Sequence, residues 1–192
     1  MDTTNDLLYQ AVKFYQDNLA GRKFEIIAER NKTQNILTVS FDIENFFHLL
    51  GLHKLIDIPL IQRSSRKVYH EILKGKITYN DISSSVHFSE MEDRLIHHQE
   101  LLNVLNINAL YFKSLRGEFK TIKADYFLCN EIVPQSLFSF LFIKSNSVPV
   151  SFFTRSERNS YIRNSIKWTI LSIKEINSAD ENAISSNKAA AV

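Results

Sequence analysis

The chain has 192 residues, of which 44% are hydrophobic, and 23 Lys and Arg against 21 Asp and Glu give a formal charge of +2. This apolar content is enough for a folded core and excludes an intrinsically disordered chain. Only four Gly and three Pro occur, which excludes a fold built mainly from loops, and a single Cys excludes an internal disulfide and a cysteine zinc site.

The charge is unevenly distributed along the chain. Residues 60–79 carry five basic side chains and one acidic one, whereas residues 80–110 carry one basic and five acidic side chains. Residues 111–176 carry ten basic and five acidic side chains. A basic half suits a polyanion such as RNA, and solvated lysines on a sheet or helix surface explain the same pattern equally well.

The N-terminal half of the chain predicts helices around one hairpin. Residues 6–20 carry an apolar stripe of helical period, and two alternating segments at residues 23–29 and 36–41 flank a polar turn. Further helices are expected at residues 42–50, 62–74 and 90–105, with a short one near Thr78 and Asp81. Ser89 and Glu92 have the spacing of a capping box for the helix at 90–105.

The C-terminal half predicts a sheet. Strand patterns occupy residues 111–115, 121–128, 136–143, 148–154 and 165–176, and the third of these is apolar on both faces, as in a central strand. Cys129 is expected to be buried in a core strand. The fold class is therefore α+β: an N-terminal helical part packed on a C-terminal antiparallel sheet of about four strands, in one domain of residues 1–176. Residues 177–192 are expected to form a disordered tail.

Residues 45–55, NFFHLLGLHKL, combine two histidines with a helix end. Asp42 is expected to cap this helix, and Gly51 to end it in the left-handed region. The helix dipole would raise the pKa of His48 in the last turn. The break at Gly51 would let His48 and His53 face one cleft as an acid–base pair. The alternative is that His53 is a surface residue and His48 a hydrogen-bonded residue at the helix end.

Other chemical motifs are absent from the sequence. It contains no phosphate-binding P-loop, dinucleotide glycine fingerprint, nucleophile elbow or H-E-x-x-H zinc motif, so no cofactor and no metal site is expected. His97 and His98 point to different sides of a helix and make a poor metal pair. His98 lies on the apolar stripe and is expected in the core, whereas His97 and Arg94 are expected on the other side.

The string NFFHLLGLHKL closely resembles the HLLGLH signature of one of the phage-borne barnase/EndoU/colicin/RelE-like nuclease families, the fourth of that series. Supporting matches are EILKGKITYNDI at residues 71–82, DRL at 93–95, KADYFL at 123–128 and SFFTR at 151–155, followed by Tyr161. The resemblance extends from about residue 24 to 176 and leaves out the N-terminal helix and the tail. It implies a four-stranded antiparallel sheet. It also implies a metal-independent RNA endonuclease that acts in the manner of toxins and phage-conflict proteins.

A metal-independent ribonuclease uses the 2′-hydroxyl of RNA as the nucleophile. Under the resemblance, His48 and His53 are the expected base and acid, in either order, and Arg155 the cation on the phosphate, leaving a 2′,3′-cyclic phosphate. The expected substrate contacts are two hydroxyls, one aromatic ring and two further cations: Ser151, Thr154, Tyr161, Lys123 and Arg94. All of these except Thr154 also have a structural alternative. It is a solvated strand end for Arg155, core or turn packing for Ser151 and Tyr161, an outward strand residue for Lys123, and a helix-surface partner of Glu90 or His97 for Arg94.

The sequence is also compatible with three other functions. A catalytically inactive RNA- or protein-binding module would use the same basic and aromatic residues. A metal-dependent hydrolase would combine both histidines with carboxylates from elsewhere, and a structural subunit would bind no RNA. The expected partners are RNA and an acidic inhibitor or antitoxin. No apolar run has membrane-spanning length and no signal peptide pattern is present, so no membrane partner and a cytoplasmic location are expected.

Overall fold

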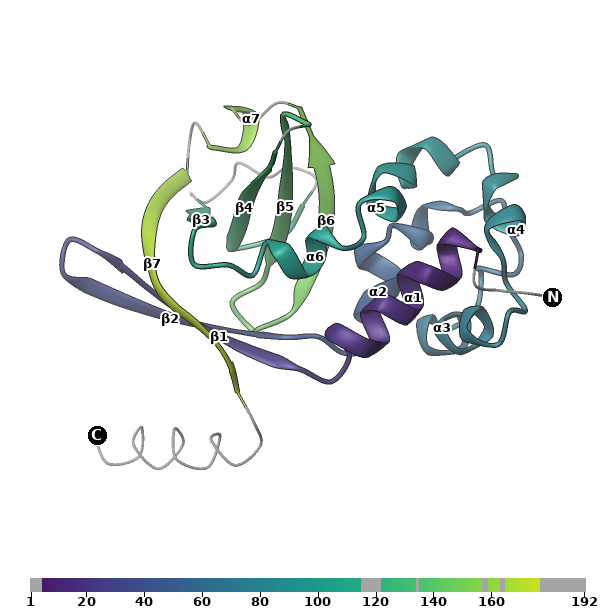
Figure 1. Cartoon of the computed structure of the whole chain (residues 1–192), viewed down its shortest axis with the longest axis horizontal. Coiled ribbons are helices and arrows are strands. Elements are labelled where there is room, and N and C mark those ends of the chain that lie inside the picture. Colours follow the sequence, from purple (N-terminus) through teal and green to yellow (C-terminus); the bar gives the residue numbers. More distant parts are fainter. Residues whose placement is uncertain (1–4, 115–121, 134, 157–158, 163–164, 177–192) are drawn as a thin grey trace.

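The computed structural model places a group of short helices beside a curled antiparallel sheet (Figure 1). It describes residues 5–114, 122–133, 135–156, 159–162 and 165–176. The predicted tail at residues 177–192 lies outside these residues. The α+β class is confirmed. Among the described residues, no helix is long and apolar enough to cross a membrane.

The helices are short, and most of them lie in the chain between the β1–β2 hairpin and the later strands of the sheet. They are α1 (Leu7–Asn18), α2 (Asn45–Leu49), the 3-10 helix η1 (Leu52–Lys54), α3 (Ser65–Leu73), α4 (Tyr79–Ser83), the 3-10 helix η2 (Phe88–Glu90), α5 (Glu92–Ile96), α6 (Glu100–Asn103) and α7 (Asn159–Ile162). Asp6 holds two of them together: one carboxylate oxygen accepts the N–H of Tyr9 at the start of α1, and the other accepts the N–H of Tyr79 at the start of α4.

The described strands form one seven-stranded sheet rather than a sheet of about four. They are β1 (Lys23–Arg30), β2 (Thr33–Ser40), β3 (Leu110–Ser114), β4 (Tyr126–Ile132), β5 (Leu137–Ile143), β6 (Pro149–Arg155) and β7 (Ser165–Ile176), in the order β2-β1-β7-β3-β4-β5-β6. The predicted hairpin is present as β1 and β2. It joins the sheet because the 12-residue β7 extends past β3: residues 165–168 pair with β3 and residues 169–176 with β1.

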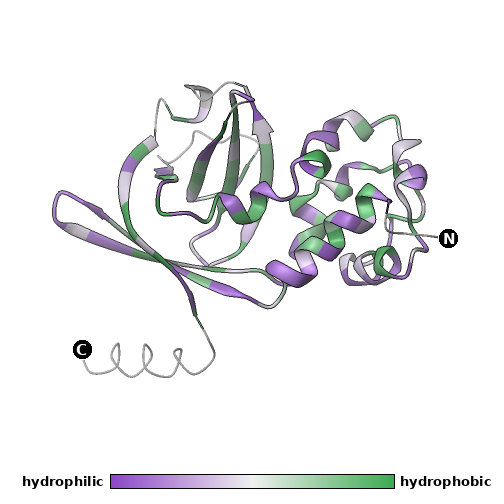
Figure 2. Cartoon of the chain, viewed as in Figure 1, coloured by the Kyte–Doolittle hydropathy of each residue, from purple (hydrophilic) through white to green (hydrophobic). Residues whose placement is uncertain are grey.

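The core lies between the helices and the sheet, with a second cluster on the opposite face of the sheet. Apolar residues of α1 and of the helix–turn segments pack on the inner faces of the strands. The second cluster is aromatic and contains Phe112, Phe127, Cys129, Phe140, Phe142 and Phe153. Cys129 is buried, as expected. β5 is buried on both faces, as predicted for a central strand, and Figure 2 shows the hydrophobic character of β4 and β5.

The helix expected over residues 90–105 is broken into η2, α5 and α6, so that prediction is wrong. Nδ1 of His98 bonds to the carbonyl oxygen of Leu95 at 2.9 Å, and in a continuous helix that oxygen would accept the N–H of residue 99. The capping box is absent as well, because Met91 is the residue before α5 and no side chain caps this helix. His98 itself is 6% exposed and packs edge-on against Phe14, so its predicted core position is confirmed.

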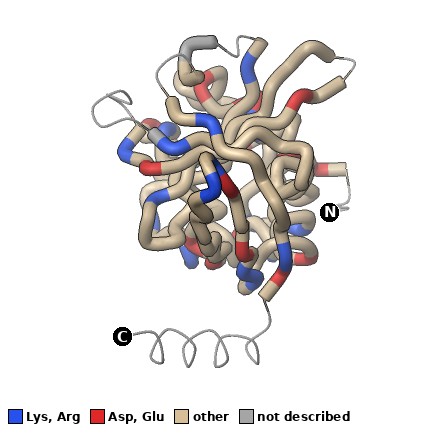
Figure 3. The backbone as a smooth tube through the Cα atoms, turned by 90° about the vertical axis from the view of Figure 1, so that its left-hand side faces the viewer, with Lys and Arg blue, Asp and Glu red and all other residues tan. Residues whose placement is uncertain are grey.

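Charges on the β1–β2–β7 side of the sheet are mixed. β1 carries two basic and two acidic side chains, and β7 carries two lysines and one glutamate. Figure 3, which faces this side, shows Lys and Arg interspersed with Asp and Glu. The described strands of this side therefore carry both signs of charge instead of basic residues alone.

Candidate functional site

A pocket of about 740 Å³ lies between the helices and the β6 edge of the sheet. One wall comes from η1, η2 and α5, and the other from β6, α7 and the residues before β4. Seven of the eight site residues predicted from the sequence line it: His53, Arg94, Lys123, Ser151, Thr154, Arg155 and Tyr161. The eighth, His48, does not line it. Residues about 100 positions apart in the chain therefore meet in one cavity.

The two histidines come together through the glycine between α2 and η1. Gly51 has φ +78°, which confirms the predicted left-handed turn. The turn brings the rings of His48 and His53 to a centroid distance of 5.1 Å, at a tilt of 45°. The predicted cap by Asp42 is wrong, because Glu44 precedes α2 and makes no side-chain cap hydrogen bond. The backbone N–H of Asp42 instead donates to the side chain of Asn45.

Both histidines bind protons less readily than a free imidazole. Both residues are exposed, yet neighbouring atoms partly shield the rings from water, and this desolvation lowers the pKa of His48. The predicted rise in its pKa is wrong because α2 is a single turn of five residues, whose dipole is weak. Desolvation also lowers the pKa of His53, and the positive charges of His48 and Arg94 lower it further, while a hydrogen bond to the Phe47 backbone acts in the opposite direction. Both rings are therefore mostly neutral at pH 7.

Arg94 is buried instead of lying on a helix surface as one prediction had it. Only 7% of the residue is exposed, and its Nε and Nη1 atoms are buried with no hydrogen-bond partner among the described residues. Burial is the main reason that its pKa is lowered. Gly51 lies directly against it: a Cβ at position 51 would be 3.2 Å from Cδ of Arg94 and 3.3 Å from its Nε. The absence of a side chain at Gly51 makes this approach possible.

The opposite wall presents an arginine on a stack of aromatic rings. The exposed guanidinium of Arg155 lies 5.2 Å from the ring centroid of Phe153 and 5.9 Å from that of Tyr161. The guanidinium of Arg94 lies 5.9 Å from the same Phe153 centroid. Phe153 thus contacts both cations, in the geometry of a cation–π interaction. Tyr161 packs against Phe140, Phe142 and Phe153, so most of its ring contacts are with the aromatic cluster.

A carboxylate connects the two walls. Asp93 of α5 accepts the backbone N–H of Thr154 at 3.0 Å. β6 is an edge strand, so its outward N–H groups have no neighbouring strand to bond to. This hydrogen bond satisfies one of them and fixes α5, with Arg94, against β6.

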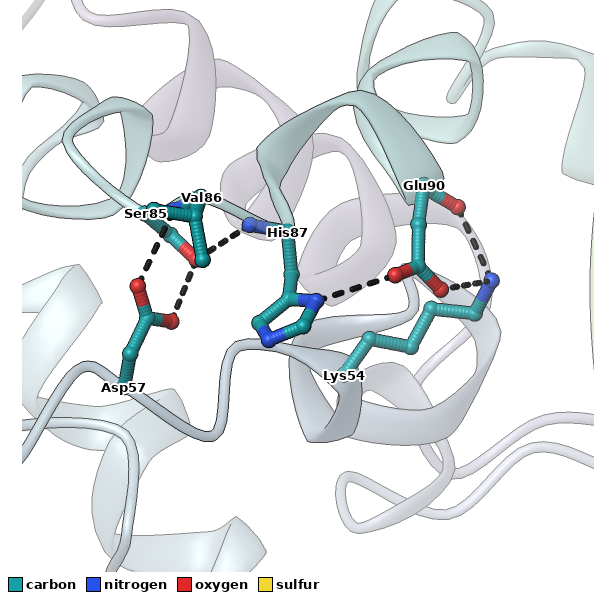
Figure 4. A network of polar contacts seen from close by, with 6 residues as sticks. All are labelled: Lys54, Asp57, Ser85, Val86, His87 and Glu90. Atoms are coloured by element: carbon teal, nitrogen blue, oxygen red, sulfur yellow. Dashed lines mark hydrogen bonds and ion pairs between the residues drawn. The ribbon is translucent and has the colours of Figure 1, made fainter.

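A second polar network holds residues 85–90 on η1 (Figure 4). Nζ of Lys54 donates to the carbonyl oxygen of Glu90 at 3.0 Å and lies 3.5 Å from its carboxylate, which also contacts Nδ1 of His87 at 3.0 Å. The hydrogen bond to His87, followed by the charge of Lys54, lowers the pKa of Glu90. Asp57 accepts the hydroxyl of Ser85 and the N–H of Val86. These contacts define the position of η2 at the rim of the pocket.

The sequence predictions missed part of the lining. The additional polar or aromatic residues that matter are Lys54, Glu90, Asp93, Lys144 and Phe153. Three of them lie within the motifs that carry the resemblance, HLLGLHKL, DRL and SFFTR, but Glu90 and Lys144 have no signal in the sequence. With five Lys and Arg and two carboxylates, the lining has a formal charge of +3. In the described ranges, no three His, Cys, Asp or Glu side chains are grouped so as to hold a metal ion.

Comparison with protein families identifies the nuclease relationship. The family model described as phage-Barnase-EndoU-ColicinE5/D-RelE like nuclease4 matches residues 7–189. The match is wider than the resemblance seen in the sequence, because it includes α1 and reaches beyond β7. No curated protein and no solved structure gives a significant match. Because the family match contains every element of both pocket walls, the chain belongs to this family of barnase-, EndoU-, colicin- and RelE-like nucleases.

Proposed function

We propose that the protein is a metal-independent endoribonuclease and that the pocket between α5 and β6 is its active site. The observation that carries this proposal is the convergence of His53, two arginines and three lysines on one cavity with a formal charge of +3. A phosphodiester chain is the substrate class that such a cavity attracts, because cations in a concave surface raise the local concentration of polyanions. The family of nucleases to which the chain belongs supports the same substrate class.

RNA provides its own nucleophile, so the protein has to move protons and stabilise charge. A base takes the proton of the 2′-hydroxyl, the oxygen attacks the adjacent phosphorus, and the P–O5′ bond breaks as an acid protonates the departing 5′-oxygen. The product end is a 2′,3′-cyclic phosphate. Each such proton transfer contributes about 10²–10⁴-fold in rate.

His53 is the better candidate for the base. It lines the pocket, and its lowered pKa leaves the ring neutral at pH 7, the form that accepts a proton. His48 is the remaining candidate for the acid, because the centroid of its ring is 5.1 Å from that of His53, although His48 itself does not line the pocket. Its lowered pKa makes the protonated form scarce at pH 7, so we expect the highest activity below pH 7.

The sheet wall would hold the RNA strand. Arg155 and Lys123 are exposed cations that suit the phosphates on either side of the cleaved bond, and the hydroxyls of Ser151 and Thr154 are hydrogen-bond donors on the same strand. The exposed face of the Arg155–Tyr161 stack suits a base, since base stacking on an aromatic ring is worth about 1–3 kcal/mol.

The test is cleavage of an end-labelled single-stranded RNA by the purified protein in excess EDTA. We expect products that end in a 2′,3′-cyclic phosphate, no cleavage of the same RNA with 2′-deoxy sugars, and loss of cleavage in His53→Ala. Cleavage that requires an added metal ion would overturn the metal-independent mechanism. RNA binding without cleavage under all conditions would instead favour an inactive binding module.

We further propose that the nuclease acts as a toxin or in phage conflict, held in check by an inhibitor whose acidic surface fits the +3 lining. Induced expression of the wild-type chain should then arrest bacterial growth, and expression of His53→Ala at the same level should not. Equal growth arrest by both chains would argue against a toxic nuclease.

A further inference from the structure

The side chain of Arg94 is the least explained group of the pocket. A guanidinium is charged at every physiological pH and carries five N–H donors. Burial of such a group is costly unless it is paired with an anion and its donors are bonded. Within the described ranges, Nε and Nη1 of Arg94 have no hydrogen-bond partner, although the residue is only 7% exposed. The cost of burying Arg94 is therefore not offset by hydrogen bonds at these two atoms.

The carboxylates near Arg94 do not supply this anion. Asp93 and Glu90 are close enough to favour its charged form, but neither forms an ion pair with it. The carboxylate of Asp93 bonds to the N–H of Thr154, and that of Glu90 contacts Lys54 and His87. The positive charge of Arg155 acts on Arg94 in the opposite direction. An anion bound in the pocket would reduce the repulsion between the two arginines and would offset the cost of burying Arg94.

The position of Arg94 is fixed from two sides. Gly51 packs against its Cδ and Nε, and the hydrogen bond of Asp93 to β6 holds the helix that carries it. The positive charge of Arg94 also lowers the pKa of His53. The burial of Arg94 makes its interactions with other charges stronger than those of a cation at the surface, and one of the groups on which it acts is the proposed base.

We propose that Arg94 binds the phosphate that is cleaved, and that the folded protein leaves Nε and Nη1 of its guanidinium without hydrogen bonds so that a phosphodiester completes the hydrogen bonding of this side chain. Arg155 then serves the neighbouring phosphates, because it is exposed and rests on the Phe153 and Tyr161 rings. The assignment of the cleaved phosphate rests on the proposed ribonuclease function, whereas the anion site itself does not.

This proposal makes stability and activity change in opposite directions. Replacement of an unpaired buried charge by an apolar side chain of similar length removes a destabilising group, so Arg94→Met should raise Tm by about 2–10 °C without ligand. The same replacement should lower kcat by about 10²–10³-fold, the usual loss when a preorganised donor to the reacting group is removed. A residue kept for structural reasons would show a fall in Tm.

The experiment compares wild type, Arg94→Met, Arg94→Lys and Arg155→Met in two assays. The first is thermal unfolding with inorganic phosphate against sodium chloride of equal ionic strength. Phosphate should raise Tm of wild type and of Arg155→Met, have a smaller effect on Arg94→Lys, and have none on Arg94→Met. The second is RNA cleavage, in which Arg94→Met should lower kcat and Arg155→Met should mainly raise KM.

Three outcomes distinguish the anion site, the role of Arg94 at the cleaved phosphate and the ribonuclease function. A lower Tm of Arg94→Met together with a retained phosphate response would overturn the anion site. Full cleavage activity in Arg94→Met would overturn its role at the cleaved phosphate and leave the nuclease proposal intact. A phosphate response that depends on Arg94, in a protein that cleaves no RNA, would support the anion site and reject the ribonuclease function.

Discussion

The two walls of the pocket differ in how much water reaches their arginines. On the helical wall, Arg94 is buried and the pKa of His53 is lowered by desolvation. On the sheet wall, Arg155 and Lys123 are exposed. A charge interaction in a site that excludes water is stronger and geometrically fixed, whereas an exposed cation is screened by salt and gives affinity rather than rate. We therefore expect the helical wall to carry the chemistry and the sheet wall to hold the strand.

Removal of the imidazole from the helical wall should reduce activity most. His53→Gln should lower kcat/KM for RNA cleavage by about 10²–10⁴-fold, because a proton-transfer group is lost. The fold should be retained, since the residue is exposed. His48→Gln is the matched variant, and its loss should be smaller because His48 does not line the pocket. Equal losses in both variants, measured by single-turnover kinetics, would mean that the two rings act as one unit.

Gly51→Ala tests whether the turn between α2 and η1 positions the helical wall. Gly51 and Gly21 have nearly the same φ, +78° and +77°, but a Cβ at Gly21 would meet nothing within 4 Å, whereas at Gly51 it would lie 3.0 Å from Cβ of Met91. Gly21→Ala should therefore cost only the left-handed backbone term, about 1–2 kcal/mol. Gly51→Ala should cost more and also lower kcat, because Arg94 has to move. Denaturant unfolding of both variants measures the difference, and equal costs would show that the contact is unimportant.

The two walls also differ in what the sequence reveals about them. HLLGLHKL predicted the glycine turn and the proximity of its histidines, because the cause is local: a helix end, a residue that tolerates positive φ and two imidazoles five positions apart. The strand at residues 148–154, with Arg155 at its end, was also predicted, and SFFTR lies in it. What could not be predicted is that these segments share a cavity, since this depends on how α5 docks on the edge of the sheet.

The wrong predictions come from long-range contacts that override a local pattern. Arg94 lies on the polar side of an expected helix, but α5 is short and that side packs on Gly51 and β6. The helix ends early because the ring of His98 competes for a backbone oxygen, which periodicity does not indicate. The sheet was predicted to have about four strands because the pairing of β7 with both β3 and the hairpin is not encoded in any single segment.

Asp93→Asn tests the hydrogen bond between the walls. The carboxylate accepts the N–H of Thr154, and a charged acceptor makes a stronger bond than an amide, so the variant should lose about 1 kcal/mol of stability. It should also raise the mobility of β6, seen as faster hydrogen exchange of the Thr154 amide. Glu92→Gln is the control. It removes the same charge from the neighbouring residue, whose side chain forms no hydrogen bond or ion pair with the described residues. Equal exchange rates in both variants would contradict the role of Asp93.

Arg155→Gln should have a smaller effect that is confined to substrate affinity. One phosphate contact of an exposed cation should account for a rise in KM of about tenfold at low salt. The slope of log K against log salt for a single-stranded RNA should become shallower by about 0.7, as expected for the loss of one contact. Because the residue is exposed, Tm should remain unchanged. A loss of kcat comparable to that of the His53 variant would place Arg155 in the chemistry and erase the contrast between the walls.

The smallest expected effect is the pH dependence of stability that comes from the helical part. Burial lowers the pKa of His98 below its ordinary value of 6.5, so the unfolded chain binds a proton in a range where the folded protein does not. Stability from this group is therefore fully present above pH 6.5 and is lost as the pH falls through 6.5 toward the pKa of the folded state. His98→Gln keeps an N–H that can donate to Leu95 and removes the titration. The decrease in Tm between pH 7 and pH 5 should be smaller in this variant than in wild type, and an identical decrease would show that His98 is protonated as easily in the folded protein as in the unfolded chain.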